Sequence, residues 1–481
     1  MARPTARVAA RRPGWRRVRQ VGALLLVAAF VATCGARVSP DAGLPPWAGP
    51  GLVGGGGWPY AGVPLPAGDA EDAAYVPGSS VVRLADGRMR LVPFGAESAV
   101  TLEASDPRVA AAVLSDRGWL SSGTVPGVRV PADDIVRLRG MASRALLDLR
   151  LLTGPDGASL ASWYGPWRYS WPRDSAFAAA AFTVTGHTDE AGRILRFMAR
   201  VQSGTGLWAA RYEPDGTPVT DGRAPQLDSV GWMLWAAWLF RAERPAAAAR
   251  VPDLWTMVRR GADHLAASLR SDGLPPPSSD YWERSPGSEQ APDDPTLGVA
   301  GPVLAGLRSA AAFADGTGRA AEAARWRAAA GRVESAVAER FAPLGYPRSP
   351  VAGGLMDTSV TFVSPPFAPA DPGVSSAVAE AARRQALPNG GVLPGENWQG
   401  NRTVAWTPET ALFALSDAAS GRTDSALSRL KWLAAHRTSL GSLPEKVGPG
   451  GGQAAVAPLG WTASLAVLTL SSLDRPLPIP R

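Results

Sequence analysis

Helical segments of two kinds alternate along most of this chain, from about residue 118 onward. In segments such as 227–239 and 461–470, apolar residues occupy every face of the helix. In segments such as 254–269, apolar residues form one stripe at helical spacing, opposite charged side chains. A helix that is apolar on all sides is buried on all sides, whereas an amphipathic helix has one face in water. The alternation therefore predicts an inner ring of helices inside an outer ring.

About twelve such segments occur, which predicts six helical hairpins. The expected fold class is mainly α, an (α/α)6 barrel (also called a six-hairpin toroid) with a short N-terminal β element. An open helical solenoid is the alternative, and the uneven lengths of the connections count against it. The expected inner helices lie near 175–184, 227–239, 299–312, 410–415 and 461–470, and the outer ones near 190–201, 254–269, 319–341, 377–387 and 424–436. Further helices near 141–152 and 357–363 complete the twelve.

The connections between these helices differ in length according to their direction. A connection that leaves an inner helix is short, as at 185–187. The connections that lead into inner helices are often long and contain Trp, Gly, Pro and acidic residues. These long loops must gather at one end of the barrel, and that end is where we expect a functional site.

The first 34 residues have the organisation of an export signal. Seven Arg and no acidic residue occur in the first 20 positions, and an apolar run follows from 21 to 33. This run is shorter than the roughly 20 residues that a membrane span needs, and it is typical of a secretory signal. The residues up to Cys34 resemble a bacterial lipoprotein cleavage site. Lipid attachment at Cys34 and cleavage of a plain signal nearby stay open, as do Sec and twin-arginine export.

The rest of the chain divides into three predicted parts. Residues 35–75 are rich in Gly and Pro and are expected to form a tether. Residues 76–117 contain two alternating runs around Asp86-Gly87, which predicts a small β element with a hairpin. Residues 118–481 are expected to form the barrel. The protein should act outside the cell or on the outer face of its membrane, contacting the membrane only through the signal or a lipid.

Charge and Cys content exclude several classes of function. Of the 49 Lys and Arg residues, seven lie in the first 20 positions, and the remaining 42 equal the 42 Asp and Glu residues. Residues 21–481 are therefore neutral and lack the basic footprint of a nucleic-acid partner. A single Cys excludes an internal disulfide framework, and three scattered His residues argue against a zinc site. We expect no metal, no cofactor and a monomer.

Three of the long loops carry acidic residues, and in two of them the acids lie beside aromatic residues. The first reads Trp-Pro-Arg-Asp-Ser at 171–175. A helix start capped by Asp174 explains this segment by itself, but an Arg–Asp pair beside aromatic rings also suits the hydroxyl groups of a sugar. Later loops read Asp-Tyr-Trp-Glu at 280–283 and Pro-Glu at 444–445. Each acid alone has an ordinary structural explanation, and the set taken in order is more informative.

These three loops, with Trp461 following the last, resemble the motifs of glycoside hydrolase family 15, the glucoamylase family of the six-hairpin glycosidases. The resemblance covers about residues 118–475. It implies an exo-acting hydrolase of oligo- or polysaccharide that releases glucose from α-glucosides with inversion. Glu283 takes the place of the catalytic acid and Glu445 that of the catalytic base. In such a pair the acid protonates the leaving oxygen, and the base activates water on the opposite face.

The resemblance also implies substrate-binding residues. Arg173 and Asp174 are expected to bind hydroxyl groups of the terminal sugar. Fungal relatives carry an Arg-Tyr pair after a double Gly in the fourth loop, whereas Gly390-Gly391 precedes Val-Leu here, so Arg402 is considered as a substitute. The other expected binding residues are Tyr169, Trp171, Trp208, Trp282 and Trp406.

Competing functions remain within this fold. Trehalase-like, glucodextranase-like and isomaltose-cleaving activities are open. A non-catalytic envelope protein that binds glycan is the alternative from another class, and such a module has no reason to keep acids at both Glu283 and Glu445. A phosphorylase needs a phosphate site in place of the base, which Glu445 argues against.

Overall fold

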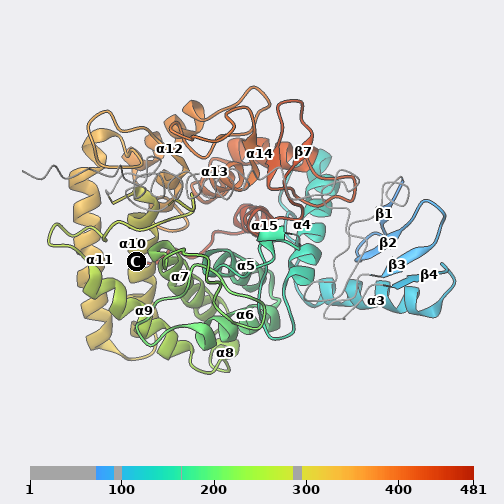
Figure 1. The fold of residues 1–481 in the computed structure, drawn as a ribbon, viewed down its shortest axis with the longest axis horizontal. Coiled ribbons are helices and arrows are strands. Elements are labelled where there is room, and N and C mark those ends of the chain that lie inside the picture. Colours follow the sequence, from blue (N-terminus) through green and yellow to red (C-terminus); the bar gives the residue numbers. More distant parts are fainter. Residues whose placement is uncertain (1–71, 92–99, 164, 285–294) are drawn as a thin grey trace, which may run out of the picture.

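Two concentric rings of helices confirm the predicted (α/α)6 barrel (Figure 1). The computed structural model describes residues 72–91, 100–163, 165–284 and 295–481. The predicted export segment 1–34 with Cys34, and all of the tether up to residue 71, lie outside the described residues. The inner ring comprises α5 (Pro172–Thr185), α7 (Leu227–Glu243), α10 (Leu297–Asp315), the 3-10 helix η4 (Thr358–Val363), α13 (Thr407–Ala419) and α15 (Gly460–Asp474).

The outer ring covers these six elements with amphipathic helices. All 14 residues of α5 are buried, whereas only seven of the 14 residues of α6 are, which is the burial contrast that the two patterns predict. Short helices η2 (Gly165–Trp167), α8 (Pro245–Ala248) and η3 (Ala342–Leu344) lie in connections. The outer helices are α4 (Ala132–Leu152), α6 (Thr188–Val201), α9 (Leu254–Ser268), α11 (Ala320–Arg340), α12 (Pro372–Arg384) and α14 (Thr423–Ala435).

Small residues allow neighbouring inner helices to approach closely. A Cβ atom at Gly231 of α7 would lie 2.1 Å from the Pro302 carbonyl oxygen of α10, and one at Gly306 would lie 2.6 Å from the Gly231 Cα atom. Both positions therefore require glycine. Within the described residues, α10 is the one helix whose length and composition fit a membrane span, but 89% of its apolar window is buried inside the barrel.

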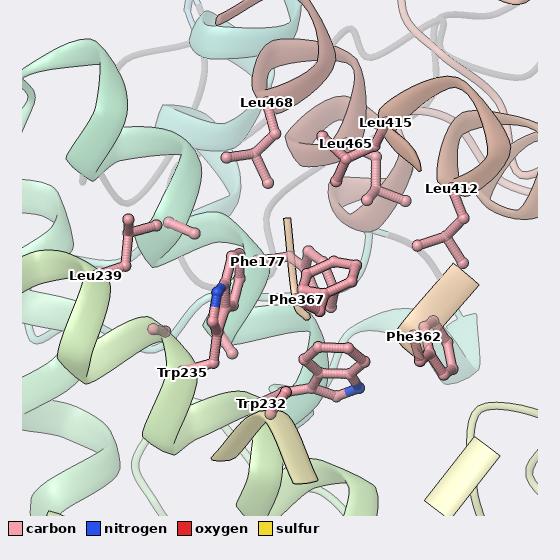
Figure 2. Close-up of a cluster of buried hydrophobic side chains, with 14 of the residues drawn as sticks. Phe177, Trp232, Trp235, Leu239, Phe362, Phe367, Leu412, Leu415, Leu465 and Leu468 are labelled. Atoms are coloured by element: carbon pink, nitrogen blue, oxygen red, sulfur yellow. The ribbon is translucent and has the colours of Figure 1, made fainter. Parts of the chain in front are cut away.

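Aromatic side chains fill the centre of the barrel (Figure 2). Phe177 of α5 packs against Trp232 and Trp235 of α7, with ring centroids 5.2 and 5.5 Å apart. Phe367 packs on the same two Trp rings at 4.7 and 5.1 Å. Trp461 of α15 joins this cluster through Phe177 and also lines the cavity described below. The aromatic core therefore supports the cavity from beneath.

The N-terminal part differs in detail from the predicted β element. Strands β1 (Ala74–Tyr75), β2 (Val81–Arg83), β3 (Met89–Leu91) and β4 (Val100–Leu102) form an antiparallel meander. The expected hairpin is confirmed as β2–β3. The sheet begins inside the predicted tether, and the interpretation of all of 76–117 as β structure is wrong, because helix α3 (Pro107–Ser122) occupies its end. The Asp106 side chain caps this helix by accepting from the Arg108 backbone N–H.

A second small sheet lies in the barrel loops. It pairs β5 (Ala405–Trp406), β6 (Lys446–Val447) and β7 (Gln453–Ala454) in antiparallel order. Because Glu445 directly precedes β6 and α13 directly follows β5, this sheet fixes the Glu445 loop against the start of an inner helix.

Candidate active site

The long loops that lead into the inner helices meet at one end of the barrel and enclose a cavity of about 690 Å³. This volume lies within the roughly 300–1,000 Å³ of small-molecule sites. Glu283 and Glu445, the two predicted catalytic residues, both line it although 162 positions separate them in the chain. The lining also includes Trp167, Trp171, Arg173, Asp174, Arg211, Arg223, Tyr281, Trp282, Arg284, Trp398, Trp406, Glu409, Lys446 and Trp461.

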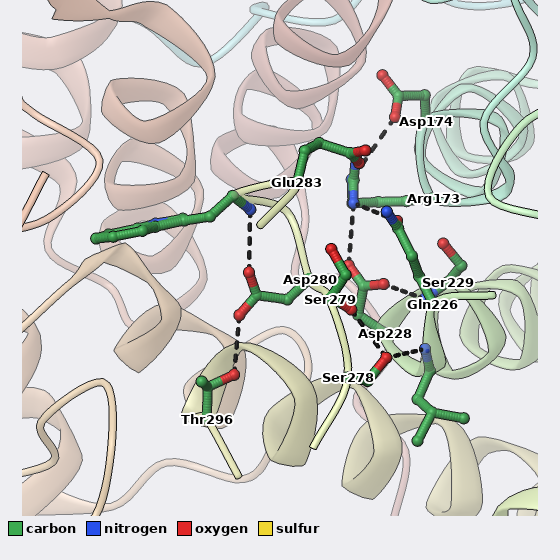
Figure 3. Close-up of polar contacts among 12 residues, drawn as sticks. Arg173, Asp174, Gln226, Asp228, Ser229, Ser278, Ser279, Asp280, Glu283 and Thr296 are labelled. Atoms are coloured by element: carbon green, nitrogen blue, oxygen red, sulfur yellow. Dashed lines mark hydrogen bonds and ion pairs between the residues drawn. The ribbon is translucent and has the colours of Figure 1, made fainter. Parts of the chain in front are cut away.

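Arg173 lies at the centre of the charged groups in this cavity (Figure 3). Its guanidinium donates to the Glu283 carboxylate at 2.8 Å and to the Asp228 carboxylate at 3.1 Å, and it lies 3.6 Å from Asp174. Trp171 is the N-cap of α5 and Pro172 follows it, so Asp174 belongs to the first turn and the interpretation of Asp174 as the cap is wrong. The helix start thereby directs Arg173 and Asp174 into the cavity.

Burial changes the protonation behaviour of the acids around Arg173. It raises the pKa of Asp228 to about 7 and that of Asp174 to about 6, although Arg173 lowers both. Burial lowers the pKa of Arg173, but the charges of Asp228 and Glu283 raise it by more. The guanidinium is therefore a permanent cation, whereas burial makes ionisation of the two aspartates more costly than usual.

A tight turn presents Glu283 to the cavity. The Glu283 backbone N–H donates to the Asp280 carbonyl oxygen at 2.8 Å, and Glu283 has a φ of 55°, in the left-handed region that non-glycine residues rarely adopt. The Asp280 carboxylate accepts from the Trp282 backbone N–H at 3.0 Å. Both oxygens of the Glu283 carboxylate accept hydrogen bonds, one from Arg173 and one from Arg223 at 2.7 Å. The side chain is therefore held at its backbone and at its tip.

Arg348 supports this turn from below. Its guanidinium donates to both oxygens of Asp280 at 2.8 and 2.9 Å and to Asp357 at 2.6 Å. It also stacks over the Trp282 ring, 4.0 Å from the centroid. Asp357 in turn accepts from the Tyr281 hydroxyl at 2.9 Å. These charges are buried, so the network holds the aromatic residues before Glu283 in one arrangement.

Backbone hydrogen bonds fix the chain at Glu445. Its N–H donates to the Val456 carbonyl oxygen at 2.8 Å, and its own carbonyl accepts from the Thr407 N–H at 3.0 Å. The pairing of β5 with β6 sets Lys446 opposite Trp406, and the Lys446 ammonium lies 4.1 Å from the centre of that ring. Glu445 is 7% exposed. Its position is therefore determined by the small sheet.

Comparison with known families agrees with this arrangement. A profile described as Glycosyl hydrolases family 15 matches residues 139–364, which include Arg173, Asp174 and Glu283. Over these residues the barrel matches the family 15 profile. The protein is accordingly a glycoside hydrolase, and its substrates are oligo- or polysaccharides. A search of curated proteins finds no match.

Solved structures share the family 15 fold with this chain. A wild-type glycosidase has 21% sequence identity and a TM-score of 0.59, over 72% of this chain and 99% of the other. A bacterial glucoamylase complexed with acarbose has 17% identity and a TM-score of 0.60, over 80% of this chain and 64% of the other. The glucoamylase from Saccharomycopsis fibuligera has 13% identity and a TM-score of 0.58, over 73% and 97%.

The predicted binding residues of this site fall into two groups. Trp171, Arg173, Asp174, Trp282 and Trp406 line the cavity, as expected of substrate contacts. The other three, Tyr169, Trp208 and Arg402, are not among the lining residues of the described chain.

Each residue of the second group has a structural partner elsewhere. Tyr169 lies behind Trp171 and under the Arg211 guanidinium, 4.6 Å from it. Trp208 is 2% exposed and its indole N–H donates to the Met198 carbonyl, so the expectation of a cavity wall there is wrong. Arg402 donates to backbone carbonyls within its own loop, at Glu396 and Trp398.

The most informative residue that the sequence analysis missed is Glu409. It lies in the first turn of α13, is 3% exposed and lines the cavity. Burial raises its pKa to about 8, and the charge of Glu445 adds to this effect while Lys446 opposes it. The sequence did contain a signal for Glu409. It directly precedes the apolar helical segment 410–415, and an acid at that position cannot face water when the segment lies inside a barrel.

Proposed function

We propose that this protein is an exo-acting glycoside hydrolase that releases glucose from the ends of α-glucosides with inversion of configuration. The observation that carries the proposal is that Glu283 and Glu445, from loops far apart in the chain, line one cavity. An inverting enzyme needs two carboxyl groups about 6.5–9.5 Å apart, one on each side of the scissile bond. A cavity with Arg173 and Asp174 among its lining residues suits the terminal sugar of a chain.

Glu283 is the proposed general acid. It must bind a proton and give it to the glycosidic oxygen as the bond breaks. Arg173 is 4% exposed and fixed by other carboxylates, whereas the Arg223 side chain is 34% exposed. Arg223 is therefore the contact that exchanges for water and substrate when Glu283 takes up its proton.

Glu445 is the proposed general base. As a carboxylate it accepts a proton from a water molecule that attacks the anomeric carbon on the face opposite the leaving group. Trp171, Trp282 and Trp406 offer apolar surfaces for the sugar ring, and Arg173 donates hydrogen bonds to its hydroxyl groups. Trehalose-, dextran- and isomaltose-type linkages remain candidates besides maltose-type ones.

A linkage panel with stereochemical readout tests this function. Purified protein is incubated with maltose, isomaltose, trehalose and dextran, and glucose release is measured, with Glu445→Gln as the matched inactive control. We expect release from at least one substrate, with β-glucose as the first anomer in proton NMR spectra. The α-anomer as first product contradicts inversion, and no release from any glycan favours the glycan-binding alternative.

We also propose that the protein is exported as a monomer, either carrying a lipid on Cys34 or released by plain cleavage. The Arg-rich start and the apolar run to residue 33 support export. Cell fractionation of the native host and of a Cys34→Ser variant tests it. Full-length protein in the cytoplasm contradicts export, and equal membrane association of both forms contradicts the lipid.

A further inference from the structure

We propose that Glu409 is a specificity-determining residue that hydrogen-bonds a hydroxyl group of the sugar bound beside Glu445. This inference rests on the proposed function, because it assigns a sugar to the same cavity. Glu409 belongs to an inner helix whose other buried side chains near the cavity are neutral. A buried acid at such a position is costly unless it has a polar partner.

The described structure leaves part of this carboxyl group without a partner. Glu409 is 97% buried, and among the described residues its Oε2 atom has no hydrogen-bond partner. Buried polar atoms in native proteins nearly always have one. Because Glu409 lines the cavity, the partner that completes its hydrogen bonding is a group that enters the cavity.

The position of Glu409 relative to Glu445 points to the terminal sugar. Thr407, two residues before Glu409, donates from its backbone N–H to the Glu445 carbonyl at 3.0 Å. The Thr407 hydroxyl also bonds the Thr462 hydroxyl at 2.8 Å, which joins α13 to α15. The turn that bears Glu409 is thus attached to the loop that bears the proposed base. A sugar whose anomeric carbon faces Glu445 brings its hydroxyl groups within reach of this wall.

The charged and titratable groups around Glu409 favour its neutral form. Glu445 raises its pKa, whereas Lys446 and Arg173 lower it by less than burial raises it, to about 8. Tyr281 is the other titratable neighbour, and burial raises its pKa well above the usual value. A protonated carboxylic acid can both donate and accept a hydrogen bond, so it suits a sugar hydroxyl better than a carboxylate does. Ionisation above pH 8 removes the donor.

Binding measurements test this inference separately from catalysis. Trp171, Trp282 and Trp406 line the cavity, so sugar binding should change tryptophan fluorescence. D-glucose and its monodeoxy analogues, each lacking one hydroxyl, are titrated into wild type, Glu409→Leu and Glu409→Gln. The matched control is Glu339→Leu, at an exposed position of α11. Thermal unfolding checks that each variant is folded.

The expected result is a coupling between Glu409 and one hydroxyl group. Glu409→Leu should weaken glucose binding about 5- to 100-fold, since a buried group loses its partner, and the loss should vanish for one monodeoxy analogue. Glu409→Gln should bind within a few-fold of wild type and keep binding above pH 8, where wild type weakens. The control should bind like wild type.

Other outcomes overturn the inference. Unchanged binding by Glu409→Leu, or an equal loss on every monodeoxy analogue, contradicts a direct hydrogen bond. If Glu409→Leu does not fold, Glu409→Gln decides the question. Glucose binding that weakens above pH 8 to the same extent in Glu409→Gln and in wild type contradicts the inference. Failure of the proposed function gives a different result from failure of this inference: the protein binds glucose but hydrolyses no glycan in the panel.

Discussion

The two proposed catalytic carboxylates line one cavity but are positioned by different physics. The Glu283 side chain is 25% exposed, and both its oxygens contact guanidinium groups. Glu445 is 7% exposed and is fixed through its own backbone by a small sheet. Beneath Glu283 lies the charged network of Arg348, whereas the backbone of Glu445 is held by hydrogen bonds to Thr407, whose hydroxyl also bonds Thr462.

This difference corresponds to the two tasks. A general acid must gain and lose a proton in every cycle, so contacts that can be exchanged at its tip are useful. A general base must stay at one distance from the water it activates, and backbone pairing gives that constancy. The contrast teaches that two carboxylates in one site can be positioned in different ways, one by buried ions and one by ordinary hydrogen bonds. The free-energy cost of breaking the two kinds of contact differs.

The largest expected effect separates the two carboxylates chemically. Glu445→Gln should lower kcat by about 10²–10⁴-fold on every substrate, because water still needs activation. Glu283→Gln should cause a similar loss on a natural glucoside but a much smaller one on α-glucosyl fluoride, whose leaving group needs little protonation. Steady-state kinetics on both substrates measures this. Equal losses for Glu283→Gln on the two substrates contradict its role as acid.

The next effect concerns the buried ions under Glu283. Arg348→Met leaves Asp280 and Asp357 buried without their cation, which should lower the free energy of unfolding by about 3–5 kcal/mol. Urea denaturation followed by circular dichroism measures it. The control is Arg383→Met, which removes an exposed pair with Glu380 on α12 and should cause no measurable change. If both variants unfold like wild type, the network does not support the turn.

The smallest effect concerns the neutral support of Glu445. Thr407→Val keeps the shape of the side chain but removes the hydroxyl that bonds the Pro444 carbonyl and Thr462. The free energy of unfolding should fall by about 1–2 kcal/mol, since buried groups lose one neutral partner. Thr403→Val, at an exposed position of the preceding loop, is the control. If Thr407→Val lowers the free energy of unfolding by more than Arg348→Met does, the hydrogen bonds near Glu445 contribute more to stability than the buried ions under Glu283, contrary to expectation.

Much of this arrangement follows from patterns in the sequence. The two helix types predict the rings because burial on all sides leaves no other place for an all-apolar helix. Loop direction predicts the end of the barrel where Glu283 and Glu445 meet. Local pattern cannot show that Arg348 pairs with Asp280, 68 positions earlier, because that pairing depends on how two loops pack.

Errors in the prediction also have physical causes. The resemblance implies a substrate contact at Trp208, yet its indole N–H donates to the Met198 carbonyl of α6 and the ring is buried in the core. Helix α3 was missed because alternating β patterns nearby hid the Asp-Pro start at 106–107, although that pair is a good cap. Glu409 was overlooked because a single acidic residue does not change the helical spacing of apolar residues on which the prediction rests.

The inner ring is closed by elements from its two ends: α15, its last helix, packs between α13 and the first inner helix α5, and also against the outer helix α4. The loop before α15 is joined to the loop before α5, since Ser162 and Trp163 donate to the carbonyls of Pro458 and Ala457. On the ribosome, therefore, the toroid stays open until the last helix has emerged. The proposed base and the Trp461 wall arrive in that same final stretch. A chain that ends before α15 therefore lacks Trp461, and the apolar flanks of α4 and α5 that α15 covers face water.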